Sequence, residues 1–228
     1  MAGLELVRIP AGTFMMGSPE DEADRYGDEG RHEVVLDSFY LARTPVTNAQ
    51  YGKYLAARPK APKPEHWGDR HVNQHDQPVV GVSWEEAQAY CEWAGLVLPT
   101  EAQWEYACRA QTTTRYSSGN TEDDLARVGW YDGNSDGRLH SVGEKPANGF
   151  GLHDMHGNVW EWCRDSFGSY ATSPRKGDGL RHEPCGTRVL RGGGRFGPAR
   201  YARSAFRSRA LPGARTSGVG FRPAQGHP

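Results

Sequence analysis

Neither sign of charge dominates this chain of 228 residues, and it has no long hydrophobic run. Its 27 Lys and Arg residues are balanced by 28 Asp and Glu residues, which argues against nucleic acid as the main partner. Hydrophobic residues make up 36% of the chain, and no stretch is apolar enough to predict a membrane span. Residues 1–6 lack the basic and apolar blocks of a signal peptide, so we expect a cytoplasmic protein with no membrane partner.

Cysteine is also scarce, and no two cysteines form a Cys-x-x-Cys pair. We therefore expect reduced thiols at Cys91, Cys108, Cys163 and Cys185. A bridge between Cys163 and Cys185, which flank one long loop, is an open alternative. Glycine, proline and tryptophan are plentiful, with 29, 15 and 7 residues, which is typical of a loop-rich fold with an aromatic core.

The end of the chain lacks residue types that are common elsewhere. From Arg191 to Arg222 there is no Lys, Glu, Gln, Trp, Met or Asp. Regular motifs in this stretch, such as Arg191-Gly192-Gly193 and Gly220-Phe221-Arg222, are separated by residues that follow no pattern. We call these separating residues the candidate variable positions: Arg195, Phe196, Gly197, Pro198, Tyr201, Phe206, Ser208, Ala210, Leu211, Gly213, Ala214, Thr216 and Ser217.

The composition of these positions has a genetic interpretation. Codons ending in a pyrimidine can specify every residue type found there, whereas they cannot specify Lys, Glu, Gln, Trp or Met. Random replacement of the adenines in a run of asparagine codons would give this result. The alternative interpretation is an Arg- and Gly-rich loop in a chain with an arginine bias.

Three capping boxes predict helices over 48–57, 84–94 and 101–110. In the second helix Trp84, Ala87, Cys91 and Ala94 recur at helical spacing and are predicted to face the core. Short strands are expected at 4–9, 14–17, 32–43, 187–191 and 219–223. Residues 111–186 show only turn signals, so they need an internal organiser such as metal ions or buried aromatics. The pattern indicates one α+β domain over residues 1–228.

Several blocks resemble one known family, and they occur in its order over essentially the whole chain. The blocks are residues 6–18, 45–51, 78–84, 98–107 and 148–162, with the two motifs at 191–193 and 220–222. They are similar to the formylglycine-generating-enzyme, or sulfatase-modifying-factor, domain. The resemblance implies a variant of the C-type lectin fold, with a small twisted antiparallel sheet, two or three helices and extensive irregular loops.

The enzymes of this family oxidise a substrate cysteine with a copper-binding cysteine pair that follows Arg-Gly-Gly. Copper(I) needs such soft thiolate ligands. Here no cysteine follows Cys185, and Gly194 stands where the family usually has serine. The resemblance therefore implies no copper and no catalysis in this chain. A formylglycine-generating-type oxidase or a related metalloenzyme is the disfavoured alternative.

The same fold is found in the variable proteins of diversity-generating retroelements. Their rewritten C-terminal segment carries asparagines where the candidate variable positions lie here. The resemblance predicts a non-catalytic scaffold that displays a hypervariable surface over about residues 190–222, which we call the variable segment. Its ligand is expected to be a protein or another macromolecule. Tyr201 and Phe206 would be aromatic contacts, and Ser208, Thr216 and Ser217 adaptable polar ones.

Two expectations concern the architecture of this segment. The candidate variable positions should be largely exposed on one face, while Val189, Leu190, Val219 and Phe221 are buried. The regularly placed Arg203 and Arg207 should hydrogen-bond the backbone of this loop-rich segment. A further alternative function is a structural interaction module whose arginine-rich segment binds an acidic surface.

Candidate metal ligands come from the resemblance and from spacing. Asp154, Gly157, Val159 and Glu161 match positions at which the family binds a structural Ca²⁺, and oxygen ligands suit that ion. Local capping and pairing is the alternative. Residues 132–137, with Asn134 and Asp136, begin like a calcium loop, but Gly143 stands at its twelfth position, which favours a plain turn. Residues 66–75, with three histidines, are expected to form a loop rather than a zinc site.

Overall fold

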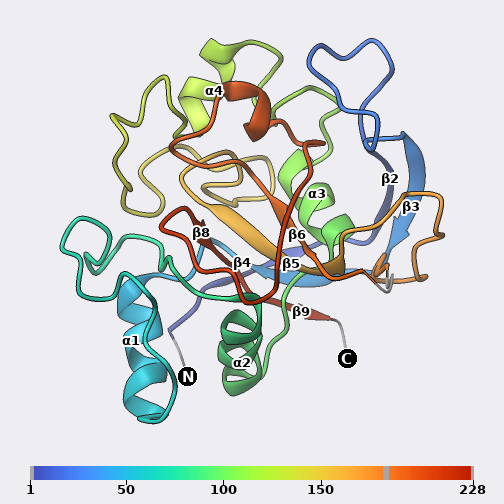
Figure 1. The fold of residues 1–228 in the computed structure, drawn as a ribbon. Coiled ribbons are helices and arrows are strands. Elements are labelled where there is room, and N and C mark those ends of the chain that lie inside the picture. The colour runs from blue at the N-terminus through green and yellow to red at the C-terminus, as the bar shows by residue number, and fades with distance from the viewer. Residues whose placement is uncertain (1–2, 182–184, 227–228) are drawn as a thin grey trace.

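The computed structural model describes residues 3–181 and 185–226 and shows an α+β fold in which short strands and helices are joined by long irregular loops (Figure 1). The predicted helices form as α1 (Asn48–Ala57), α2 (Trp84–Ala94) and α3 (Glu101–Arg109), and each begins with the expected capping box. In α2, Ala87, Cys91 and Tyr90 are fully buried, whereas Trp84 and Ala94 are only partly buried.

Residues 111–186 contain two regular elements that the sequence interpretation missed, so its description of this region as turns alone was wrong. Helix α4 (Glu122–Val128) begins at Thr121 with a capping box closed by Asp124. Strand β5 (Trp160–Ser166) has most of its side chains buried on both faces, so it lacks the alternation by which a half-exposed strand is recognised.

Six of the other strands overlap the predicted ranges, whereas β7 and β9 were not predicted. The described strands are β1 (Leu6–Ile9), β2 (Gly12–Met16), β3 (His32–Leu36), β4 (Phe39–Ala42), β6 (Arg188–Arg191), β7 (Ser208–Ala210), β8 (Val219–Gly220) and β9 (Ala224–Gly226). The expected long strand 32–43 is divided between β3 and β4. The amide of Asp37 donates to Gly177 O (2.8 Å) at the division, outside the strand ladder.

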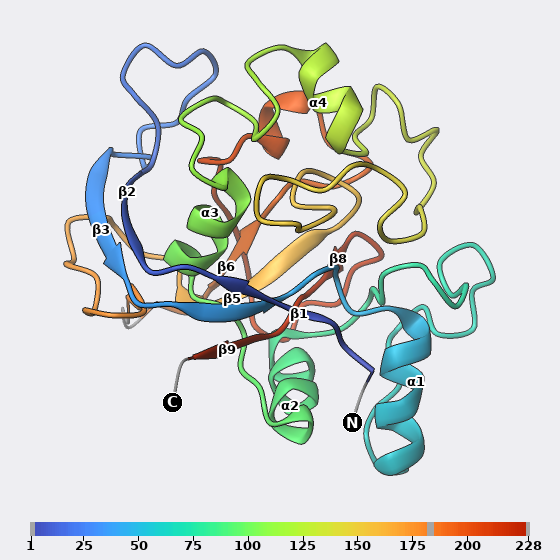
Figure 2. The same cartoon turned by 180° about the vertical axis from the view of Figure 1, so that it is seen from behind.

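The strands form three small sheets, in the orders β1-β4-β9, β2-β3 and β7-β6-β5-β8. In the four-stranded sheet β5 pairs antiparallel with β6 and parallel with β8. Strand β9 pairs with β4, so the C-terminal part of the chain closes the N-terminal sheet, and both ends emerge on the same side of the molecule (Figure 2). The variable segment therefore starts and ends in strands beside β5.

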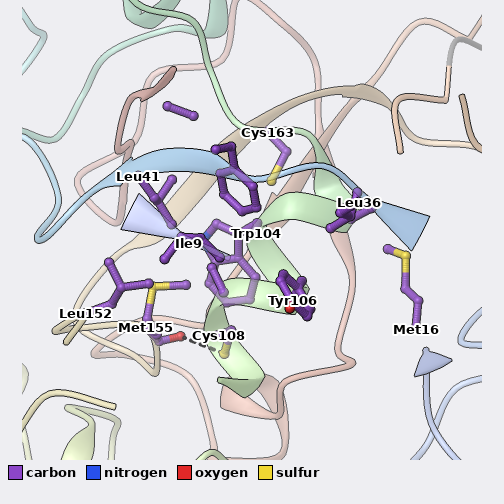
Figure 3. Packing of buried hydrophobic residues seen from close by; sticks show 14 of the residues in the cluster. Ile9, Met16, Leu36, Leu41, Trp104, Tyr106, Cys108, Leu152, Met155 and Cys163 are labelled. Atoms are coloured by element: carbon purple, nitrogen blue, oxygen red, sulfur yellow. Dashed lines mark hydrogen bonds between the residues drawn. The ribbon is translucent and has the colours of Figure 1, made fainter. Parts of the chain in front are cut away.

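Helix α3 lies in the middle of the main core. Trp104, Cys108 and Tyr106 from α3 pack among Ile9, Leu152 and other apolar side chains (Figure 3). Every residue of α3 is buried, including its charged ones. Buried charges require counter-charges. The variable segment supplies arginines to Glu101 and Glu105, and Glu105 also pairs with Arg109 within the helix. No helix of the described residues is long and apolar enough to cross a bilayer.

Candidate ligand-binding surface

Four arginines at regular places in the variable segment are buried and paired with carboxylates. We call Arg191, Arg203, Arg207 and Arg222 the frame arginines. Each carboxylate partner lies far away in the sequence, on α3, on β5 or in the loop of residues 19–29. These ion pairs tie the variable segment to the rest of the molecule.

Arg191 organises the backbone of the segment itself. Its guanidinium pairs with Glu105 on α3. It also donates hydrogen bonds to the carbonyls of Ser204 (2.7 Å), Ala205 (2.9 Å) and Phe206 (2.7 Å). These carbonyls have no partners in a strand ladder, so a side chain of the same segment satisfies their hydrogen-bonding capacity. Arg191 thus has the backbone role that the sequence led us to expect of Arg203 and Arg207.

The expectation holds for Arg203, whose Nε donates to Arg200 O (3.1 Å), and is wrong for Arg207, whose backbone hydrogen bond goes to Asp28 O (3.2 Å) outside the segment. Both arginines also bind carboxylates. Arg203 forms a bidentate pair with Glu29 (2.6 and 2.8 Å) and a further ion pair with Glu22 (2.6 Å). Arg207 forms a bidentate pair with Glu101 (2.7 and 2.9 Å). Burial alone would raise the pKa of Glu101, but the Arg207 and Arg191 guanidiniums hold it below its usual value. A buried guanidinium is stabilised chiefly by a charged partner, and backbone oxygens alone do not supply one.

Most candidate variable positions reach the surface. Phe196 and Leu211 are 62% and 65% exposed, and Gly213 and Thr216 are also exposed. A second group is partly exposed: Gly197, Pro198, Tyr201, Ser208, Ala210, Ala214 and Ser217. Figure 1 looks onto the face that this part of the chain crosses, in orange to red, in front of β5 and β6. Val189, Leu190, Val219 and Phe221 are buried, as predicted.

Two candidate variable positions are not exposed, and for them the prediction was wrong. Phe206 is 7% exposed because its ring packs against Tyr201 (4.7 Å between ring centroids), Trp160 (5.8 Å) and Tyr26 (5.2 Å). Arg195 is 3% exposed. Of the two predicted aromatic contacts, Tyr201 is therefore open to a ligand, while Phe206 supports it from below.

Tyr26 adds to the surface from outside the variable segment. Its side chain is 44% exposed and contacts the edge of the Phe206 ring. Trp160 is partly buried and lies beside Tyr201 and Phe206. No pattern around Tyr26 in the sequence indicates this position, because the contact joins segments that are distant along the chain.

A cleft lies at one side of the surface. The candidate variable positions Arg195, Phe196 and Ser217 form one wall. Loops that include His71 and His140 form the rest. Residues 66–75 are turns, as predicted.

Of the two carboxylates expected to bind calcium, Glu161 is already paired with a cation. Both oxygens of Glu161 accept hydrogen bonds from Arg222 (2.8 Å each), and one also accepts from the indole of Trp104 (2.9 Å). Asp154 is buried, which raises its pKa, and it accepts from the amide of Gly143 (2.8 Å). Because the Arg222 guanidinium neutralises Glu161, these residues as arranged do not fit a calcium ion.

Gly157 and Val159 also have structural roles. Gly157 has a φ of 80°, and an added Cβ would lie 2.0 Å from Trp130 O. Its carbonyl accepts from the amide of Val159 (2.8 Å). Glycine is therefore required here by backbone conformation and by close packing.

The expected plain turn at residues 132–137 also forms. Asn134 accepts from the amide of Tyr131 (3.0 Å) and donates to Gly129 O (3.0 Å), so both ends of its side chain close the turn. Asp136 is exposed and pairs with Arg138 (3.1 Å). Within the described residues no group of three or more His, Cys, Asp or Glu side chains is arranged to hold a metal ion.

All four cysteines are free thiols, so the alternative of a Cys163–Cys185 bridge is not realised. Cys91, Cys108 and Cys163 are buried, and burial raises the pKa of each, to about 12 for Cys108. Hydrogen bonding from Thr187 lowers the pKa of the more accessible Cys185. None of the four lies in the variable segment.

Residues 2–226 match the model of the "Sulfatase-modifying factor enzyme 1-like domain". The chain belongs to this family. A Chlamydia caviae protein named serine/threonine-protein kinase pkn1 is 37% identical over 97% of the chain and 38% of its own length. The chain thus spans well under half of that relative. The formylglycine-generating enzyme of Streptomyces coelicolor is 33% identical over 95% of the chain and 87% of its own length.

Two solved structures of similar proteins cover the whole fold. PvdO from Pseudomonas aeruginosa superposes with a TM-score of 0.90 at 31% identity, over 99% of this chain and 95% of its own. Treponema denticola variable protein 1 has a TM-score of 0.84 at 26% identity, over 100% of this chain and 98% of its own. The expected α+β fold, a C-type lectin variant of the sulfatase-modifying-factor subtype, is confirmed.

Proposed function

We propose that this member of the sulfatase-modifying-factor family is a non-catalytic binding protein whose candidate variable positions form its ligand-binding surface. One observation carries the proposal: buried, ion-paired frame arginines flank two stretches of the segment, 196–201 and 208–217, in which the candidate variable side chains are partly or fully exposed. The backbone is thus held by residues that keep their places, while the surface between them is free to differ.

The energetics of substitution support this division. Truncating a core side chain costs roughly 2–5 kcal/mol, whereas most surface changes fall within about 0.5 kcal/mol. Phe196, Leu211 and Thr216 are exposed, so replacing them removes little packing. A scaffold of this kind tolerates many versions of one surface. The resemblance in fold to Treponema denticola variable protein 1 agrees with this interpretation.

The proposal includes the absence of copper and of oxidase activity. The stretch after Gly193 contains no thiol, and the buried cysteines elsewhere have raised pKa values that disfavour the thiolate. The proposed ligand is a protein or another macromolecule met in the cytoplasm. Nucleic acid is disfavoured because the chain carries a formal charge of only −1.

Two experiments test the proposal. The chain and the Streptomyces coelicolor enzyme are incubated with a Cys-x-Pro-x-Arg peptide, with and without Cu(I), and formylglycine is measured by mass spectrometry. We expect conversion by the enzyme alone, and turnover by this chain would refute a non-catalytic role. Sequencing the DNA around the gene should reveal a reverse-transcriptase gene and a near-copy of the segment's codons that differs at adenines. Absence of both would remove the hypervariable part of the proposal.

A further inference from the structure

Arg195 is a buried cation with unused hydrogen-bonding capacity. Its Nη1 donates to Ser217 O (2.7 Å), and its guanidinium lies over the ring of Phe196, 4.1 Å from the ring centroid. Its Nε is buried and has no hydrogen-bond partner. Orphaned buried donors are rare in folded proteins because they forfeit their hydration without replacement.

Arg195 also lacks a counter-charge, unlike the frame arginines. Among residues 3–181 and 185–226 no carboxylate forms an ion pair with it. Burial alone lowers the pKa of Arg195, to about 10, and no neighbouring acid opposes that shift. An unpaired buried charge costs free energy that an incoming anion would recover.

Arg195 lies in the wall of the cleft described above. Arg195, Phe196 and Ser217 line it together with two acids, Asp69 and Glu144. These acids have partners of their own: Asp69 accepts from the backbone of His71 (2.9 Å), and Glu144 pairs with His140 (3.3 Å). Arg138, which also lines the cleft, pairs with Asp136. Arg195 is therefore the lining cation that lacks a carboxylate partner in the described structure.

We propose that Arg195 binds a carboxylate, namely an Asp or Glu side chain of a protein ligand that enters the cleft beside the exposed Phe196 ring. The guanidinium matches a carboxylate in shape, and a single positive charge matches a single negative one. A phosphate dianion fits less well, since the one positive charge of Arg195 leaves its second negative charge unmatched. The inference rests on the proposed binding function and specifies the chemistry of one part of that surface.

Binding of two capped dipeptides tests the inference. Acetyl-Glu-Phe-amide and its neutral counterpart acetyl-Gln-Phe-amide are titrated into the ¹⁵N-labelled full chain, and arginine Nε–H signals are followed by NMR. We expect the Glu peptide to shift the Arg195 signal and to bind about tenfold more tightly than the Gln peptide. The inference would be overturned if the two peptides bound equally well. It would also be overturned if inorganic phosphate bound and the Glu peptide did not.

Variants assign the effect to the residue. Arg195→Gln should abolish the preference for Glu, and Arg209→Gln, an exposed arginine of the same segment outside this cleft, should keep it. If Arg195→Gln fails to fold, Arg195→Lys serves instead, because it keeps the charge without the planar fork and should reduce the preference. An unchanged preference in a folded Arg195 variant contradicts the inference. A negative result for Arg195 alone would not contradict the proposed function, because oxidase activity and the flanking DNA test that function separately.

Discussion

At the scale of single residues, the variable segment depends on charges that are satisfied across long sequence distances. Arg203 pairs with Glu29, 174 residues away, and Arg207 pairs with Glu101, 106 residues away. A buried ion pair adds little to stability compared with well-packed apolar residues in the same place. Removing one partner, however, leaves an uncompensated buried charge. Replacing a single frame arginine therefore destabilises the fold, whereas replacing an exposed candidate variable residue does not.

We expect Arg207→Ala to lower the free energy of unfolding by about 3–5 kcal/mol, because Glu101 would lose its bidentate partner in a buried site. Urea unfolding followed by circular dichroism measures the change. Arg209→Ala, at an exposed position two residues away, should alter stability by less than about 0.5 kcal/mol. Similar stabilities for the two variants would show that the Arg207–Glu101 pair does not hold the segment.

His156 makes stability depend on pH. Its ring is buried, which lowers its pKa to about 4; Nδ1 lies 2.7 Å from Ala202 O, and Nε2 accepts from the amide of Ser117 (3.0 Å). Between pH 6.5 and 4 the unfolded chain therefore binds a proton at His156 that the folded chain excludes. The contribution of this residue is present above pH 6.5 and is lost as the pH falls toward 4.

The magnitude follows from the width of this window. From pH 7.5 to 5 the wild type should lose about 2 kcal/mol more stability than His156→Asn, which keeps a donor for Ala202 O. Urea titrations of both proteins at the two pH values measure the difference. Asp165, whose burial raises its pKa to about 7, acts in the opposite direction in both proteins and cancels in the comparison. Parallel pH profiles would exclude His156 as the source.

At the scale of elements, the stretch between β6 and β8 has a backbone fixed by buried contacts and exposed side chains that can be replaced. We expect the free energy of unfolding of the triple variant Phe196→Asn, Leu211→Asn and Thr216→Asn to lie within about 1 kcal/mol of the wild-type value, since all three side chains are exposed. Phe206→Ala should cost at least about 2 kcal/mol, because its ring is buried among aromatic side chains.

Thermal and urea unfolding of these two variants decide where the exchangeable surface ends. If the triple variant unfolds, the exposed side chains are needed for folding, and the proposal of a displayed variable surface is wrong. If Phe206→Ala leaves the free energy of unfolding unchanged, Phe206 belongs with the positions that can be replaced freely.

At the scale of the whole molecule, the long loops are organised by aromatic packing and arginine ion pairs. Because Arg222 neutralises Glu161, we expect removal of divalent ions with EGTA to leave the melting temperature unchanged. Scanning calorimetry with and without added Ca²⁺ measures this, since an ion that binds only the folded state raises stability by mass action. A fall in melting temperature on chelation that Glu161→Gln abolishes would restore the calcium site.

The sequence by itself determined the features that depend on near neighbours. The helices begin where Thr47, Ser83 and Thr100 open capping boxes of four residues, and this local pattern is visible in the sequence. The separation of regular motifs from candidate variable positions is likewise written along the chain, as is the absence of cysteine after Cys185.

Only the tertiary structure decided which of those positions face a ligand. Arg195 and Phe206 stand in the same irregular pattern as Phe196 and Leu211, yet the first two are buried and the last two are exposed. Burial depends on what lies above each side chain, and Tyr26 and Trp160 come from distant segments. Strand β5 escaped prediction for a related reason, because a strand buried on both faces carries no alternation of polar and apolar residues. Long-range packing, which local patterns do not encode, sets both outcomes.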